Sequence, residues 1–166
     1  SVRQFDDARH LRQSVLGALD RSGLPPHLLE LEITEGLFLE SELHPRNSIQ
    51  RLRERGVRVA LDDFGTGYSA LGYLHRFPMD TLKIDQCFIR DLDAPHAEDL
   101  VSGILNLARP FGLEVVAEGV ETADHARRLH RLGCPLAQGF GYARPGTPGQ
   151  IAELLQTGGH LPLHSV

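Results

Sequence analysis

Acidic and other polar side chains stand at or near the ends of five apolar segments in this sequence. They are Glu32 and Glu35 for the first segment, Asp62 and Asp63 for the second, Lys83 and Asp85 for the third, Glu118 and Glu121 for the fourth, and Gln138 for the fifth. If these segments are neighbouring parallel strands, their carboxyl ends meet at one edge of a sheet, where parallel α/β proteins bind ligands. Because burying so many unpaired charges would be prohibitively unfavourable, these groups must face one another, solvent or cations.

The acids among them have the chemistry of a divalent metal site. Glu32, Asp62, Asp63 and Glu118 all carry negative charge, and Lys83 alone would face them with a positive one. A site made of carboxylates favours hard ions such as Mg²⁺ or Mn²⁺ over zinc. Two such ions about 4 Å apart form the usual clamp for in-line attack on a phosphodiester. A single acid at a strand end is more often a helix cap or a salt-bridge partner, so the hypothesis depends on the coincidence of several strand ends.

A second interpretation of the same region starts from its glycines. Gly65 and Gly67 follow an apolar segment in the spacing of a dinucleotide-binding fingerprint, and Asp85 stands eighteen residues beyond Gly67. A pyrophosphate held there would lie against Asp62 and Asp63, and electrostatic repulsion opposes that arrangement unless metals intervene. We therefore interpret the glycines as a sharp turn that lets the two acids reach a metal site.

Helical and strand patterns alternate along the chain. Apolar residues at helical spacing predict helices, and short apolar runs bounded by turn residues predict strands. The predicted helices cover 6–22, 42–55, 69–77, 97–111, 123–133 and 148–158, and the predicted strands cover 28–33, 57–64, 81–85, 113–120 and 135–140. Strands this apolar are buried on both faces, as in a parallel sheet covered by helices. Five strands are too few to close an eight-stranded barrel, so the fold is either an open sheet or a barrel without its first strands.

The composition excludes several classes of function. The 166 residues are 41% apolar and 23% charged, which is enough for one compact domain. A formal net charge of −5 with dispersed basic residues argues against a DNA or RNA polymer as partner. The apolar runs are strand-sized, which predicts neither a membrane span nor a signal peptide. Cys87 and Cys134 are isolated, which predicts reduced thiols in a cytoplasmic protein. His125, His130 and the basic run 127–131 are expected on a solvated helix surface.

Five segments of the sequence together resemble successive motifs of one protein family. They are LELEITEG (29–36), LDDFGTGYSAL (61–71), LKIDQCFI (82–89), VVAEGVET (115–122) and QGFGYARP (138–145). In this order and spacing they are similar to the motifs of the EAL domain family. The resemblance implies a (β/α)8 TIM-barrel-like fold, here incomplete, with five parallel strands and their helices. It also implies a phosphodiesterase that hydrolyses cyclic di-GMP to linear pGpG with two Mg²⁺ or Mn²⁺ ions.

The resemblance assigns roles to individual side chains of the predicted site. It makes Glu32 a metal ligand, Asp62 the carboxylate that bridges both metals, and Asp63 a ligand of the second metal. Lys83 would position the attacking water and offset charge on the phosphate. Glu118 would bind metal and act as the general base that activates the water.

Four further side chains are expected around this centre. Glu35 resembles the glutamate that anchors the loop after the DDFG motif, a loop implicated in substrate binding, metal binding and dimerisation. Gln138, Glu121 and Asp85 are expected to line or support the substrate site. The same loop, together with the helix that follows FIRDL (88–92), predicts a homodimer contact.

The sequence departs from the family pattern at its beginning. No Glu-Ala-Leu segment occurs in it, and the opening SVRQF resembles the end of the family's next motif, after a metal-binding asparagine. We therefore expect residues 1–166 to be a single EAL domain fragment, the C-terminal two-thirds of the barrel, with an upstream sensory or GGDEF-type domain in the parent protein. The open sheet edge predicts self-association, and the two missing ligands predict weak or no activity of the fragment itself.

Two functions remain compatible with these residues. The first is the metal-dependent cyclic di-GMP phosphodiesterase. The second is a catalytically silent EAL-type receptor, which binds cyclic di-GMP and signals through contacts with other proteins. Such receptors usually lose an acid or degrade the DDFG loop, whereas this sequence keeps both.

Overall fold

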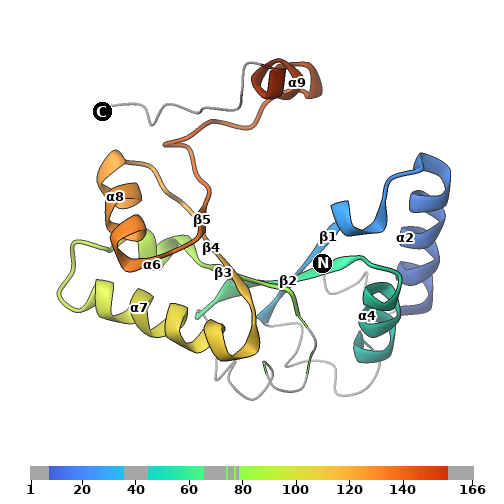
Figure 1. The fold of residues 1–166 in the computed structure, drawn as a ribbon, viewed down its shortest axis with the longest axis horizontal. Helices are drawn as coiled ribbons and strands as arrows, with labels where there is room; N and C mark the ends of the chain where they lie inside the picture. The colour runs from blue at the N-terminus through green and yellow to red at the C-terminus, as the bar shows by residue number, and fades with distance from the viewer. Residues whose placement is uncertain (1–7, 36–44, 66–73, 75–76, 78, 157–166) are drawn as a thin grey trace. The chain divides into compact units, whose positions relative to one another are not determined.

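Parallel strands alternate with helices along the chain (Figure 1). The structure is a computed structural model, and it describes residues 8–35, 45–65, 74, 77 and 79–156. Its strands are β1 (Glu30–Thr34), β2 (Arg58–Phe64), β3 (Thr81–Ile84), β4 (Glu114–Ala117) and β5 (Leu136–Ala137), paired in the order β1-β2-β3-β4-β5. The prediction of five parallel strands with intervening helices is therefore confirmed. Among the residues described, β1 and β5 are the edges of this sheet.

The pairing of the strands follows directly from their hydrogen bonds. β1 and β2 are parallel, with Glu32 opposite Ala60 and Thr34 opposite Asp62. β4 and β5 are also parallel, with Ala117 opposite Ala137. Parallel neighbours need a crossover connection between them, and the helices of this chain are those connections.

The helices agree with the predicted ones wherever the structure describes them. They are α2 (Ala8–Ser22), α4 (Pro45–Glu54), α6 (Gln86–Arg90), α7 (Ala97–Ala108), α8 (Ala123–Leu132) and α9 (Pro148–Gln156), with short 3₁₀ turns η1 (Pro26–Leu28) and η2 (Arg109–Phe111). The predicted helix over 69–77 lies outside the described residues apart from residues 74 and 77. Residues 6–7, 42–44 and 157–158, at the ends of three other predicted helices, lie outside them too.

The chain divides into two compact units, and the first contains β1, β2 and most of β3. This unit comprises Ser1–Lys83 together with Ala108–Glu114. Within it α2 packs against α4 (Figure 1) around a core of Leu19, Leu52 and Val57. These three apolar side chains therefore fix α2 and α4 relative to each other.

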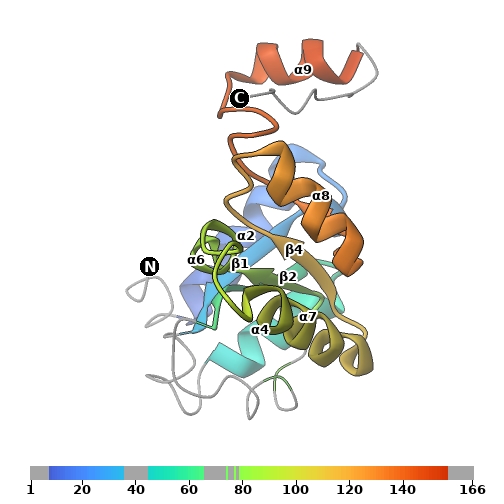
Figure 2. The ribbon, with the colours of Figure 1, turned by 90° about the vertical axis from the view of Figure 1, so that its left-hand side faces the viewer.

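The second unit comprises Ile84–Leu107 and Val115–Val166. Here α7 and α8 lie side by side (Figures 1 and 2), and Arg128 of α8 ties them together. Its guanidinium pairs with Asp93 at 3.0 Å and with Asp124 at 2.9 Å, and it donates to the Leu92 carbonyl at 2.8 Å. The basic run 127–131 is thus mixed in character, because Arg128 is half-buried while Arg127 and Arg131 are exposed, as predicted for this helix surface.

The structure shortens two predicted strands and adds one helix. β4 ends at Ala117 and β5 at Ala137, so Glu118 and Gln138 follow their strands directly. Strand geometry stops after β4 because Gly119 has a φ of 73°, in the left-handed region. The added helix is α6, which Asp85 caps by accepting the Cys87 amide at 2.8 Å.

Two sequence-based expectations about thiols and membranes can also be compared with the structure. Cys87 and Cys134 are both free thiols, and burial together with Asp85 raises the pKa of Cys87 to about 11. No helix in the described part of the chain is long and apolar enough to cross a membrane.

We predict that Asp80→Asn lowers the free energy of unfolding by about 2 kcal/mol at pH 7, because hydrogen bonds to a charged group usually contribute about that much stability. Asp80 accepts from Arg53 at 3.0 Å and 2.5 Å and from the Val59 amide at 2.9 Å. Although burial opposes ionisation, these donors lower the pKa of Asp80 below its ordinary value. The stability it adds is therefore present above the unfolded pKa of about 4 and is lost as pH falls through the folded pKa.

Urea unfolding at pH 7 and at pH 3 measures this effect. The difference between the wild type and Asp80→Asn should shrink at the lower pH. Asp20→Asn, which changes an exposed aspartate of α2, is the matched control and should leave stability nearly unchanged. Equal destabilisation by Asp80→Asn at both pH values would contradict the prediction.

Candidate active site

A buried lysine organises the acidic residues of the first unit. Lys83 lies on β3 and is only 5% exposed, yet it carries an ammonium group. Its Nζ contacts Glu32 Oε1 at 2.6 Å and Asp62 Oδ1 at 3.1 Å. Glu32 is on β1 and Asp62 on β2, so three consecutive strands each contribute one member of this cluster.

The charges of this cluster do not balance. Two carboxylates offset the ammonium of Lys83, and burial of that ammonium would otherwise be strongly unfavourable. Asp62 Oδ1 is buried and, in the part of the chain that the structure describes, accepts no well-aligned hydrogen bond besides its ion pair with Lys83. Such an oxygen keeps acceptor capacity in a site with excess negative charge, and this combination fits a divalent cation.

Asp63 adds a further carboxylate because its backbone is unusual. Neighbouring residues on a strand normally point to opposite faces of the sheet. Asp63 has a φ of 57°, the left-handed conformation that aspartate tolerates better than most residues. Carboxylate oxygens of Asp62 and Asp63 consequently lie within 4.8 Å of each other.

Glu35 holds the backbone that follows these acids. Its side chain lies just beyond β1 and is 3% exposed. Glu35 Oε2 accepts the Gly65 amide at 3.4 Å, and Gly65 itself has a φ of 96°. The structure therefore joins Glu35 to the turn after the DDF segment, whereas Gly67 and the rest of that predicted loop lie outside the described residues.

In the second unit, Glu118 and Gln138 form a directly bonded pair. Gln138 Nε2 donates to Glu118 Oε1 at 2.6 Å. The two residues follow β4 and β5, and the pairing of these strands continues through them. The backbone amide of Gln138 donates to the backbone carbonyl of Ala117 at 2.8 Å. The backbone amide of Val120 donates to the backbone carbonyl of Gln138 at 3.0 Å. The backbone thus fixes the side-chain pair in place.

Two glycines bring the segments after β4 and β5 into close contact. A Cβ atom at Gly139 would lie 2.3 Å from the Val120 backbone, and one at Gly141 would lie 2.8 Å from the Glu121 backbone. No other residue fits at such distances. The positions of Glu118 and Gln138 therefore depend on the absence of side chains next to them.

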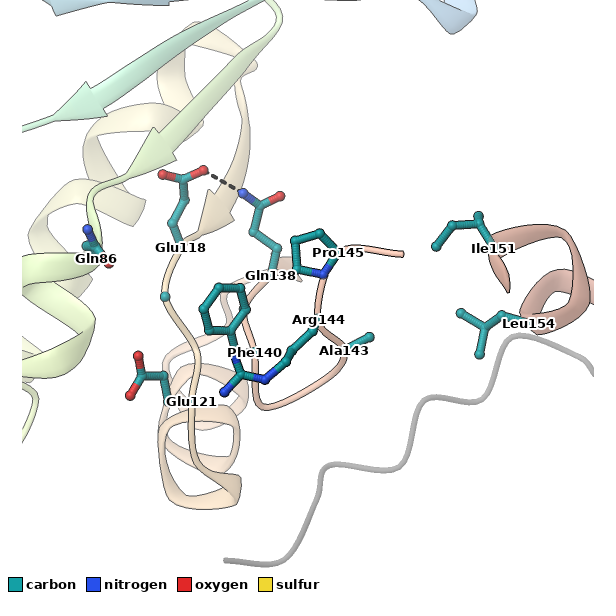
Figure 3. A pocket seen from close by; sticks show the side chains of 12 residues that line it. Gln86, Glu118, Glu121, Gln138, Phe140, Ala143, Arg144, Pro145, Ile151 and Leu154 are labelled. Atoms are coloured by element: carbon teal, nitrogen blue, oxygen red, sulfur yellow. Dashed lines mark hydrogen bonds between the residues drawn. The ribbon is translucent and has the colours of Figure 1, made fainter. Parts of the chain in front are cut away.

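A cavity of about 530 Å³ lies beside this pair. Its lining residues are Gln86, Glu118, Gly119, Glu121, Gln138, Gly139, Phe140, Ala143, Arg144, Pro145, Ile151 and Leu154. Figure 3 shows the bonded Glu118 and Gln138 on one side and Ile151 and Leu154 of α9 on the other. Glu121, predicted to support the site, is exposed and lines the same cavity. The cavity offers polar groups at one end and apolar groups at the other.

Sequence reasoning missed two members of this cavity. The guanidinium of Arg144 lies over the Phe140 ring at 4.8 Å from its centroid, the geometry of a cation–π contact (Figure 3). Both residues belong to the QGFGYARP motif, so their spacing of four residues was the available signal. Asp85 lies in this unit as well, but its Oδ1 accepts the Cys87 amide. Although burial opposes ionisation of Asp85, hydrogen bonds from Cys87 and Gln86 lower the pKa of its carboxyl group.

The predicted site residues therefore fall into two groups. Glu32, Glu35, Asp62, Asp63 and Lys83 lie in the first unit, and Asp85, Glu118, Glu121 and Gln138 lie in the second. Glu32, Asp62, Asp63 and Lys83 lie within β1, β2 and β3, whereas Glu35, Asp85, Glu118 and Gln138 directly follow strands and Glu121 lies further along the segment after β4. The fold and its polar groups define a parallel α/β protein with a carboxylate-rich set of strand ends.

The chain belongs to the EAL domain family. The model of that family, described as "EAL domain", matches residues 1–145. The EAL domain in the crystal structure of Mycobacterium smegmatis DcpA is 42% identical in sequence to this chain. The two structures superpose with a TM-score of 0.83, over 89% of this chain and 66% of that chain. The EAL-type fold inferred from the sequence motifs is thereby confirmed.

Two further relatives connect this fold to a ligand. The cyclic di-GMP phosphodiesterase NbdA of Pseudomonas aeruginosa is 40% identical over 152 residues, which is 91% of this chain and 18% of NbdA. Klebsiella pneumoniae BlrP1, solved in complex with manganese and cyclic di-GMP, is 35% identical in sequence to this chain. The two structures superpose with a TM-score of 0.72, over 84% of this chain and 35% of that chain. The chain spans about a fifth of the length of the curated relatives it matches.

We predict that Lys83→Met lowers the free energy of unfolding by about 3 kcal/mol, because it leaves Glu32 and Asp62 without their buried counter-charge. Methionine keeps most of the side-chain volume, so the loss reports on charge. The double variant Lys83→Met/Asp62→Asn also removes one of the two carboxylates that lost their counter-charge, so it should recover part of the stability. Urea unfolding without divalent cations measures both. Additive losses in the double variant would show that the contact carries no coupling energy.

We also predict that Gly139→Ala destabilises the chain by more than about 2 kcal/mol, because its Cβ would overlap the Val120 backbone. Gly103→Ala is the matched control. Gly103 lies within α7, and a Cβ there meets nothing within 4 Å, so this change should stabilise the chain by about 1 kcal/mol. Thermal unfolding compares the two variants, and a neutral Gly139→Ala would refute the close approach of the two segments.

Proposed function

We propose that this chain is part of a cyclic di-GMP phosphodiesterase domain that hydrolyses its substrate to linear pGpG by two-metal, in-line attack of water, and that residues 1–166 alone have weak or no activity. The observation that carries the proposal is the excess of carboxylate around one buried lysine. Lys83 offsets charge from Glu32 and Asp62, and Asp63 places a further carboxylate within 4.8 Å of Asp62. NbdA and BlrP1 supply the substrate class, since one is a cyclic di-GMP phosphodiesterase and the other is in complex with that nucleotide.

The donor set fits Mg²⁺ or Mn²⁺. Glu32, Asp62, Asp63 and Glu118 would hold the two ions, because all four offer only carboxylate oxygens, which hard cations prefer. When bound, such ions lower the pKa of a water molecule and offset the charge that develops on the phosphate and the leaving oxygen. Similarity to the manganese complex of BlrP1 supports the choice of a hard divalent cation.

The side chains of this chain supply the remaining steps. Lys83 keeps Glu32 and Asp62 oriented through contacts of 2.6 Å and 3.1 Å. Glu118 accepts the proton of the attacking water, and Gln138 orients its carboxylate by donating to Oε1 at 2.6 Å. The water oxygen bonds to phosphorus as the bond from phosphorus to the 3′ oxygen breaks. The leaving 3′ oxygen takes up a proton from solvent, and the cyclic diester becomes a linear one. Glu35 supports the backbone at Gly65, next to the two aspartates.

The cellular setting is proposed by the same reasoning. Because the chain spans about a fifth of its curated relatives, we place it in a longer cytoplasmic protein with an upstream sensory or GGDEF-type domain. A homodimer through the loop after the DDFG motif would couple such a domain to the site. Size-exclusion chromatography with light scattering distinguishes this dimer from a monomer.

We predict that, in the longer protein that contains the whole domain, Glu118→Gln abolishes most hydrolysis while leaving nucleotide binding intact. Loss of a general base reduces turnover by about 10²–10⁴-fold. The amide keeps the volume of the carboxylate, so affinity for cyclic di-GMP in the presence of Ca²⁺ should change little. Glu153→Gln, on the exposed surface of α9, is the matched control and should retain full turnover. Chromatographic detection of pGpG and calorimetry measure the two quantities.

The outcomes of this experiment separate the candidate functions. Turnover by the wild type that Glu118→Gln eliminates supports the phosphodiesterase. Binding of cyclic di-GMP without any turnover by the wild-type longer protein would replace it with the silent receptor, whereas inactivity of residues 1–166 alone is expected from the two missing ligands. Unchanged turnover in Glu118→Gln would remove Glu118 from the role of general base.

A further inference from the structure

A second concave site lies in the first unit, among the helices and away from the strand-end residues already described. Arg12 and Leu16 of α2 line it together with Arg51, Glu54 and Arg55 at the end of α4. Its volume is about 490 Å³, within the range of about 300–1,000 Å³ that is usual for ligand pockets. Three positive charges and one negative charge therefore surround a single cavity.

The packing of α2 against α4 brings these arginines to one place. Arg12 and Leu16 are four residues apart on α2 and lie on one helix face, Arg51 lies in the last turn of α4, and Arg55 directly follows that helix. Leu19, Leu52 and Val57 form the core that joins α2 to α4, with Leu16 packed against it. The same packing that fixes the two helices therefore brings the arginines of both segments to one cavity.

The arginines of this cavity differ from two neighbouring arginines of the first unit, Arg53 and Arg58. Arg53, also on α4, pairs with Asp80, and Arg58 on β2 pairs with Glu30 and Glu114. In contrast, Arg12, Arg51 and Arg55 form no ion pair with any residue that the structure describes. Glu54, the acid in the lining, accepts a hydrogen bond from Gln50 at 3.3 Å.

Local helix physics accounts for only part of this arrangement. Cations at the end of a helix are stabilised by its dipole, which favours Arg51 and Arg55 at the end of α4. The same effect does not apply to Arg12, which lies within α2. Like charges four residues apart also repel each other. An external anion would relieve this repulsion and satisfy all three guanidinium groups.

We propose that this cavity binds a small phosphate-bearing anion. Guanidinium groups donate two parallel hydrogen bonds to phosphate oxygens, which makes arginine the preferred residue for phosphate recognition. The hollow is open to solvent, and its three arginines surround a single volume of about 490 Å³, so a small anion fits it better than an extended polymer. This site is independent of the proposed phosphodiesterase activity.

Inorganic pyrophosphate is the probe for this site. Titration of the protein with pyrophosphate, at constant ionic strength and with EDTA to remove divalent cations from the carboxylates, should give saturable binding by calorimetry. The variant Arg12→Gln/Arg55→Gln should weaken that binding about tenfold or more, as expected when charged hydrogen bonds are lost. Arg21→Gln removes the same charge from an exposed position of α2 outside the cavity and should have no effect.

Vesicles with and without a phosphorylated lipid distinguish the source of the phosphate. Competition of these vesicles with pyrophosphate would assign the site to a lipid headgroup, and absence of competition would assign it to a free phosphate compound. The proposal is overturned if pyrophosphate does not bind above the salt control. It is also overturned if Arg21→Gln weakens binding as much as the double variant. Circular dichroism of each variant verifies that the helices remain formed. The variant Arg55→Lys keeps the positive charge but not the paired donors of the guanidinium group, so it should weaken binding to an intermediate degree.

Discussion

The contact of one buried ammonium group with two carboxylates determines the arrangement of the first unit. Lys83 lies within β3, where solvent cannot stabilise its charge, and Glu32 and Asp62 replace that solvent. Because the three residues come from three adjacent strands, the register of β1 against β2 decides whether both acids reach the same nitrogen. A slip of β1 by one residue would turn Glu32 to the opposite face of the sheet from Asp62. Charge complementarity and strand register therefore reinforce each other here.

Much of this fold was predictable because its signals are local. The apolar runs of β2 and β3 and the amphipathic pattern of α7 and α8 identified their elements to within a few residues. Motif spacing likewise placed the acids at strand ends. The length of β4 and β5 was not predictable, since apolar residues recur after both, at Val120 and Phe140. Their ends depend on the backbone of Gly119 and the contact of Gly139 with Val120, which involve residues distant in sequence.

Other features escaped prediction because one residue can satisfy two interpretations. Asp85 matched the site pattern and also serves as the cap of α6, a helix too short to show periodicity. Phe140 and Arg144 were read as parts of a motif, and only their spatial contact shows that they share a cavity with Glu118. Arg12, Arg51 and Arg55 looked dispersed in the sequence because α2 and α4 are joined only by packing. For Arg12, Arg51 and Arg55 the cause is long-range contact, which sequence patterns do not encode.

The left-handed backbone of Asp63 restricts how this position can change. At a φ of 57°, most side chains would cost about 1 kcal/mol or more, whereas glycine, asparagine and aspartate adopt the conformation readily. Of these three, only aspartate supplies a carboxylate. Most substitutions at this position would therefore destabilise the backbone whatever their effect on function. The replacements that the backbone tolerates, asparagine and glycine, remove the negative charge and leave the turn intact. The geometry of a single peptide thus makes loss of the charge separable from loss of the fold.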